Sequence, residues 1–207
     1  MNKKLPKIFI IFIFFILEVN LIAQNEKLKS GIYLNFQNFK NNNPLPIEKI
    51  CFEKKAGLFL IDNLVNNDKF TFVDDSGFVR EFYTKNIWGF YENGNIYIKR
   101  NREFFKIIYV GKISFFISKI QTVMSEQLFE MSPYKRIFPN EEFKQYLLDF
   151  ETGQVYDFNE KNLEKLLAND TLLYNEFKSL SKKQKKQLKF YYIRRYNEKH
   201  PLPFLFD

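Results

Sequence analysis

The sequence predicts an α+β protein in which an antiparallel sheet of about six to eight strands precedes C-terminal helices. Short aromatic and β-branched runs follow one another closely between residues 48 and 156, with turn residues between them, as is typical of an antiparallel meander. From residue 157 to residue 200, leucine and tyrosine recur at helical spacing. The 207 residues include 26 phenylalanines and 12 tyrosines, which are large apolar side chains suited to a substantial core.

Residues 1–23 have the layout of a cleavable signal peptide. A lysine-containing start precedes an uninterrupted apolar run from Ile8 to Leu17, and polar residues follow the small residue Ala23. A membrane-spanning helix needs roughly 20 apolar residues, about twice the length of this run. We therefore expect cleavage near Ala23 and export to the periplasm, the cell envelope or the exterior, with a retained segment as the alternative.

Cleavage would leave a chain that is still basic. The formal net charge of +8 includes three lysines and one glutamate of residues 1–23, so their removal leaves about +6. We expect residues 24–207 to form a single α+β domain. Within it, we expect a lead-in segment over residues 24–46, mostly β structure over residues 48–156, and helices over residues 157–200.

Turn residues divide the β region into hairpins. Asn93-Gly94 lies between two apolar runs and is the strongest hairpin signal, because both turn positions adopt positive φ. The other predicted turns are residues 74–77, 111–112 and 151–153, which contain glycine or acidic residues. Residues 120–142 show no clear pattern.

Three helices are predicted in the C-terminal part. Asp157 and Glu160 have the spacing of a capping box, and Asp170 and Ser181 are suited to cap the two helices that follow. Apolar residues recur every three or four positions, as on the buried face of a helix. These stripes comprise Leu163, Leu166 and Leu167, then Leu173, Phe177 and Leu180, then Leu188, Tyr192 and Tyr196.

The chain has few residues for metal or nucleophilic chemistry. Cys51 is the only cysteine and lies in an apolar run, so we expect it to be buried in a strand, with a reactive or intermolecular thiol as the alternative. His200 is the only histidine, and a zinc site usually needs several His or Cys ligands. The sequence has no phosphate-binding loop and no dinucleotide-binding motif. We therefore expect no metal and no cofactor.

Asp74 and Asp75 form the most conspicuous pair of carboxylates. An Asp-Asp-Ser-Gly sequence between two predicted strands is first of all a turn, because these side chains bond to their own backbone. Calcium binding or surface recognition is one alternative. Catalysis is another, since a catalytic pair of carboxylates has no diagnostic spacing in a sequence.

The clearest charge feature is a run of cations in the last predicted helix, among which tyrosines are interleaved. Basic and aromatic residues together can bind nucleic acid or an anionic membrane surface. Because we expect export, we favour an anionic membrane surface, an acidic envelope polymer or an envelope protein over nucleic acid. The structural interpretation is the stronger one, in which the lysines form a solvated face and the aromatic residues pack inward. The candidate interaction residues are Lys182, Lys183, Lys185, Lys186, Lys189, Arg194 and Arg195.

Four groups of residues, in their order along the chain, resemble a known family. They are residues 31–36 with 39–44, Trp88-Gly89-Phe90 before Asn93-Gly94, residues 148–153, and residues 192–201. With these segments the chain resembles a group of exported proteins of Gram-negative bacteria that carry a domain of unknown function. The resemblance implies export, and it carries over neither an activity nor any site residue.

We expect a non-enzymatic binding or structural module of the envelope or the exterior, because histidine and cysteine are nearly absent and no catalytic motif occurs. One alternative is a carboxylate-based hydrolase that acts in the envelope. Another is binding to an anionic membrane surface through the basic last helix. A pocket that holds two close carboxylates with raised pKa values would favour the hydrolase. An exposed patch of tyrosine and phenylalanine would favour binding.

Overall fold

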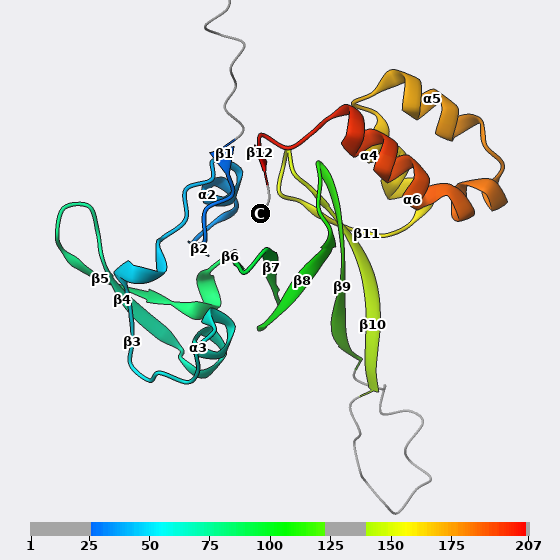
Figure 1. Ribbon diagram of the computed structural model, residues 1–207. Coiled ribbons are helices and arrows are strands. Elements are labelled where there is room, and N and C mark those ends of the chain that lie inside the picture. The colour runs from blue at the N-terminus through cyan, green and yellow to red at the C-terminus, as the bar shows by residue number, and fades with distance from the viewer. Residues whose placement is uncertain (1–25, 123–139, 206–207) are drawn as a thin grey trace, which may run out of the picture.

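The computed structural model describes residues 26–122 and 140–205 (Figure 1). It has the predicted α+β fold, in which a seven-stranded antiparallel sheet has the order β11-β10-β9-β8-β7-β6-β2. The predicted signal segment and most of the ambiguous stretch at 120–142 lie outside the described residues. The strands of this main sheet are β2 (Gly31–Tyr33), β6 (Gly89–Glu92), β7 (Asn95–Arg100), β8 (Glu103–Tyr109), β9 (Ile113–Thr122), β10 (Asn140–Asp149) and β11 (Val155–Asp157).

Tight turns join β6 to β7, β7 to β8, β8 to β9 and β10 to β11 in the main sheet. Asn93 and Gly94 have φ values of 50° and 74° between β6 and β7, in the left-handed region that asparagine and glycine tolerate. Gly153, with a φ of 75°, lies in the turn between β10 and β11. The predicted hairpins at these positions and at residues 111–112 are confirmed, because each flanking pair of strands is antiparallel.

A second, three-stranded antiparallel sheet precedes the meander, so the predicted run of strands divides into two sheets. It consists of β3 (Ile50–Phe52), β4 (Lys69–Val73) and β5 (Val79–Tyr83). A helix that the sequence did not predict, α3 (Leu60–Asn66), lies between β3 and β4 in the chain. Its leucines pack with the inner face of the small sheet against Ile32 and Phe90 of the main sheet.

Cys51 is exposed, which corrects the prediction of a buried thiol. It lies in β3, opposite Thr71 of β4. Neighbouring residues of a strand point to opposite faces, and Phe70 is the buried residue of β4, so Thr71 and Cys51 belong to the outer face. All three residues of β3 are apolar, and such a strand gives no alternation from which its inner face could be deduced.

The three C-terminal helices cover one face of the main sheet at β9 and β10 (Figure 1). Leu163, Leu167 and Ile193 of these helices are fully buried in the same cluster as Phe115 and Leu147 of the sheet. The helices are α4 (Glu160–Leu167), α5 (Thr171–Ser179) and α6 (Lys182–Lys199).

Side chains cap the first turn of each of these helices. Asp170 and Ser181 cap α5 and α6, as predicted. Asn159 caps α4 in place of the predicted Asp157, because Asp157 is still part of β11. Helix α4 therefore begins two residues later than predicted.

The opposite face of the main sheet is covered by α2 and by the end of the chain. Phe116, the neighbour of Phe115 in β9, belongs to a cluster that includes Phe39, Phe150 and Phe204. The ring centroid of Phe204 lies 5.7 Å from those of Phe39 and Phe150. At the two ends of the described chain, β1 and β12 pair in one short parallel sheet. The remaining elements are β1 (Glu26–Lys27), α2 (Phe36–Lys40), η1 (Ile47–Lys49), η2 (Thr84–Asn86) and β12 (Phe204–Leu205).

Candidate binding surface

Helix α6 carries all the cations that the sequence singled out. A capping box begins the helix: the Ser181 N–H donates to Gln184 Oε1 at 3.0 Å, and the Gln184 N–H donates to Ser181 Oγ at 3.4 Å. Tyr192, Ile193 and Tyr196 are buried, so this side of the helix packs against the rest of the protein. The predicted inward packing of Tyr192 and Tyr196 is confirmed.

Lys185 and Arg195 are engaged with acidic residues of the neighbouring helices. Lys185 forms an ion pair with Glu164 of α4, with Nζ 2.7 Å from Oε2. Arg195 forms an ion pair with both carboxylate oxygens of Glu176 of α5. This guanidinium lowers the pKa of the Glu176 carboxyl below its usual value.

Lys189 is engaged with an aromatic ring. Its ammonium lies 4.0 Å from the ring centroid of Phe158, a cation–π contact, and 3.4 Å from the Phe158 carbonyl oxygen. Lys185, Lys189 and Arg195 therefore stabilise the packing of α6 against neighbouring parts of the protein.

The other four candidate interaction residues are exposed. Their side chains form no hydrogen bond or ion pair with any part of the chain that the structure describes. Residues three or four positions apart lie on one side of a helix, which brings Lys182, Lys183 and Lys186 together. Arg194 continues this side two turns further on. We call these four residues, Lys182, Lys183, Lys186 and Arg194, the cationic face.

Two aromatic residues beside the cationic face remain about half exposed. Phe190 is 48% exposed and Tyr191 is 45% exposed. Phe190 lies one turn after Lys186 and one turn before Arg194. Tyr191 is one of the tyrosines interleaved with the basic run. Phe190 was not predicted, although its four-residue spacing from Lys186 and Arg194 could have revealed it.

The cationic face is electrostatically unfavourable for its own helix. Lys182 and Lys183 occupy the first turn of α6, which contains no acidic residue. The N-terminal end of a helix carries partial positive charge and is stabilised by anions. The first acidic residue of α6 is the exposed Glu198, at the far end of the helix.

The C-terminal end of α6 is anchored, and His200 belongs to this anchor. Asp170 Oδ2 accepts hydrogen bonds from Lys199 Nζ at 2.6 Å and contacts His200 Nε2 at 2.8 Å. The Lys199 ammonium is the main cause that lowers the pKa of the buried Asp170 carboxyl. Within residues 26–122 and 140–205, no group of three or more His, Cys, Asp or Glu residues could hold a metal ion.

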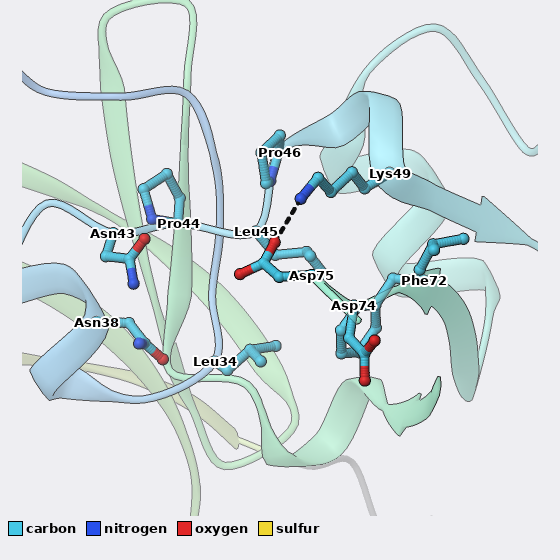
Figure 2. A pocket seen from close by; sticks show the side chains of 11 residues that line it. Leu34, Asn38, Asn43, Pro44, Leu45, Pro46, Lys49, Phe72, Asp74 and Asp75 are labelled. Carbon is cyan, nitrogen blue, oxygen red and sulfur yellow. Dashed lines mark hydrogen bonds and ion pairs between the residues drawn. The ribbon is translucent and has the colours of Figure 1, made fainter. Parts of the chain in front are cut away.

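Asp74 and Asp75 lie at a groove of about 300 Å³ between the Asn43–Pro46 segment and the β4–β5 hairpin (Figure 2). Asp75 forms an ion pair with Lys49 at 2.8 Å. Asp74 Oδ1 accepts from the backbone N–H of Ser76 at 2.9 Å, and its other oxygen accepts from Arg80. The Arg80 hydrogen bond is the main cause that lowers the pKa of Asp74. The observed geometry is that of a turn.

The outer face of the small sheet is a second exposed surface. Val79 is 70% exposed and Tyr83 is 46% exposed in the edge strand β5. They lie on the same face as Cys51, since Val79 is opposite Val73 and Tyr83 is opposite Lys69. This surface has mixed charge, because Lys69 forms ion pairs with Glu81 and Glu53.

Comparison with protein-family profiles, curated proteins and solved structures finds no match to this chain. Among the residues that the structure describes, no helix combines the length and apolar character needed to cross a membrane.

Proposed function

We propose that this chain is an exported, non-enzymatic binding module that recognises an anionic partner through the cationic face of α6. The observation that carries the proposal is the division of the cations within one helix. Lys185, Lys189 and Arg195 are engaged by neighbouring side chains or the backbone. The cationic face presents the remaining positive charge to solvent in one place.

The unfavourable position of these lysines supports a binding function. Lys182 and Lys183 oppose the partial charge at the start of their own helix, and their side chains make no compensating contact with the described residues. Features that weaken local structure without a structural gain are expected at functional sites. Binding of an anion would supply the missing compensation.

Export is part of the proposal and is supported by the sequence of residues 1–23. An exported protein meets anionic lipids, acidic polymers and envelope proteins, whereas nucleic acid is the less accessible polyanion. The partner we propose is accordingly an anionic component of the envelope.

The hydrolase alternative depends on two close carboxylates, one of which has a raised pKa. Asp74 is the candidate general acid at the groove in Figure 2, and its pKa is shifted in the opposite direction. Its neighbour Asp75 is engaged by Lys49. Both observations support a turn, so we retain binding as the proposed function.

Replacement of the four residues of the cationic face by glutamine tests this proposal. We expect the variant to bind immobilised polyphosphate at least tenfold more weakly than the unmodified protein, because electrostatic attraction scales with the number of cations near the polyanion. Affinity should also fall with rising salt, since the screening length is about 10 Å at 0.1 M.

A matched control removes the same number of charges elsewhere. Its substitutions to glutamine are at the exposed residues Lys85, Arg102, Lys106 and Lys161. We expect only a small loss of polyphosphate binding in this control. Equal losses in the two variants would contradict a localised binding surface.

A further inference from the structure

We infer that the anionic partner is the surface of a lipid bilayer, an inference that rests on the proposed function. The cationic face alone would suit any polyanion. Its distinguishing feature is that two neighbouring rings are about half exposed: Phe190, between Lys186 and Arg194, and Tyr191, one turn before Arg194. The contacts of these two rings decide between a soluble polymer and a membrane.

Packing holds the Phe190 ring at the surface. Its centroid lies 4.9 Å from the centroids of both Phe115 and Phe158. The remaining 48% of the residue is open to solvent. Because the ring is already fixed, little conformational freedom would be lost when it enters a lipid interface.

Tyr191 is fixed in a similar way. Its ring is perpendicular to that of Tyr192, with centroids 5.4 Å apart, and the Arg195 guanidinium lies 5.4 Å from its centroid. Arg195 is itself held by Glu176. Tyr191 therefore presents an apolar ring and a polar hydroxyl from a rigid position, the combination favoured at the depth of lipid headgroups.

A bilayer surface satisfies both parts of this face. Lipid phosphates attract the ammonium and guanidinium groups, while the apolar region just below them accepts aromatic rings. The long stems of Lys182, Lys183 and Lys186 can lie along that boundary with their charges in the headgroup layer. A soluble, highly charged polymer would complement the cations and leave the exposed apolar area of both rings in water.

The geometry also sets the mode of binding. Tyr192, Ile193 and Tyr196 of α6 are buried, so only the remaining side of the helix is available. The helix would lie parallel to the bilayer and enter it to the depth of the headgroups. Glu198 limits the contact at the C-terminal end, because it would be repelled by anionic lipids.

The test compares two probes: vesicles of equal parts phosphatidylglycerol and phosphatidylcholine, and immobilised polyphosphate. The aromatic variant is Phe190→Gln with Tyr191→Gln, and its matched control is Ile108→Gln with Phe143→Gln, two residues that are 57% and 69% exposed elsewhere. We expect the aromatic variant to co-sediment with vesicles at least tenfold more weakly than its control. We expect both to bind polyphosphate equally.

The outcomes distinguish failure of the bilayer inference from failure of the proposed function. Equal vesicle binding by the aromatic variant and its control would overturn the bilayer inference, and the proposed function would stand if the four-glutamine variant still lost polyphosphate binding. If that variant bound both probes as well as its matched control, the proposed function would fail too.

Because Phe190 also packs on Phe115 and Phe158, its substitution can impair folding, and a second variant controls for this effect. Tyr191→Gln alone should weaken vesicle binding several-fold and leave circular dichroism unchanged. A Tyr191→Trp variant supplies a direct readout of depth. Its fluorescence emission should shift to shorter wavelength with vesicles and not with polyphosphate, and an unshifted emission with vesicles would contradict insertion of this residue.

Discussion

At the scale of single residues, acidic partners from other helices determine which cations of α6 form ion pairs. Lys185 meets Glu164, which is 21 positions earlier in the chain, and Arg195 meets Glu176, which is 19 positions earlier. Lysine and arginine have the same formal charge in the sequence, so only the packing of α4 and α5 on α6 distinguishes engaged cations from free ones. The sequence located the basic helix, and the fold determines which four residues remain available.

The buried Asp170 makes the stability of the protein depend on pH. Its folded-state pKa is lowered, so its stabilising contribution is present in full above the ordinary carboxyl pKa and is lost as the pH falls toward the lowered value. We expect Asp170→Asn to reduce the free energy of unfolding at neutral pH by about 2 kcal/mol.

The difference between the protein and its Asp170→Asn variant should shrink below about pH 4, where the unfolded chain begins to bind the proton. Urea unfolding of both proteins between neutral pH and pH 2 measures this difference. A difference that stays constant over the whole range would show that the charge of Asp170 contributes nothing.

At the scale of elements, the start of α6 carries a cost that can be measured. We expect Lys182→Glu with Lys183→Glu to stabilise the protein by about 0.3–1 kcal/mol for each substitution, because acidic residues favour the first turn of a helix. For a chain of this size, this corresponds to a rise in Tm of about 2–4 °C per kcal/mol. Thermal unfolding followed by circular dichroism provides the measurement.

The control for each of these substitutions is Arg194→Glu, which makes the same two-unit charge change in the second half of α6. It should leave Tm unchanged or lower it. If all of these changes shifted Tm equally, the effect would come from net charge, and the interaction with the helix terminus would be disproved.

Elements with a strong local signal were predictable, and elements defined by distant contacts were not. Asn93-Gly94 specifies its hairpin through backbone conformation, and Asp170 and Ser181 specify helix starts through side-chain caps. Helix α3 has no side-chain cap at Phe59 and was missed. The outward direction of Cys51 follows from its pairing with Thr71 of β4, which no local pattern of an apolar three-residue strand could reveal.

At the scale of the whole molecule, the two ends of the described chain stabilise each other. Phe204 is 3% exposed and its ring packs against Phe39 and Phe150. We expect Phe204→Ala to reduce the free energy of unfolding by about 3 kcal/mol, the usual cost of removing a buried aromatic ring.

The matched control is Phe143→Ala, since Phe143 is 69% exposed in β10. It should change the free energy of unfolding by no more than about 0.5 kcal/mol. Chemical denaturation of both variants measures these changes in the free energy of unfolding. Equal effects would refute a structural function for the C-terminal strand.

Titration of the isotope-labelled protein with polyphosphate locates the anion-binding surface residue by residue. We predict that the largest amide chemical-shift changes occur within residues 182–194, which contain the cationic face. Changes centred on the outer face of β3, β4 and β5, or spread evenly over the molecule, would show that the cationic face is not the anion-binding surface.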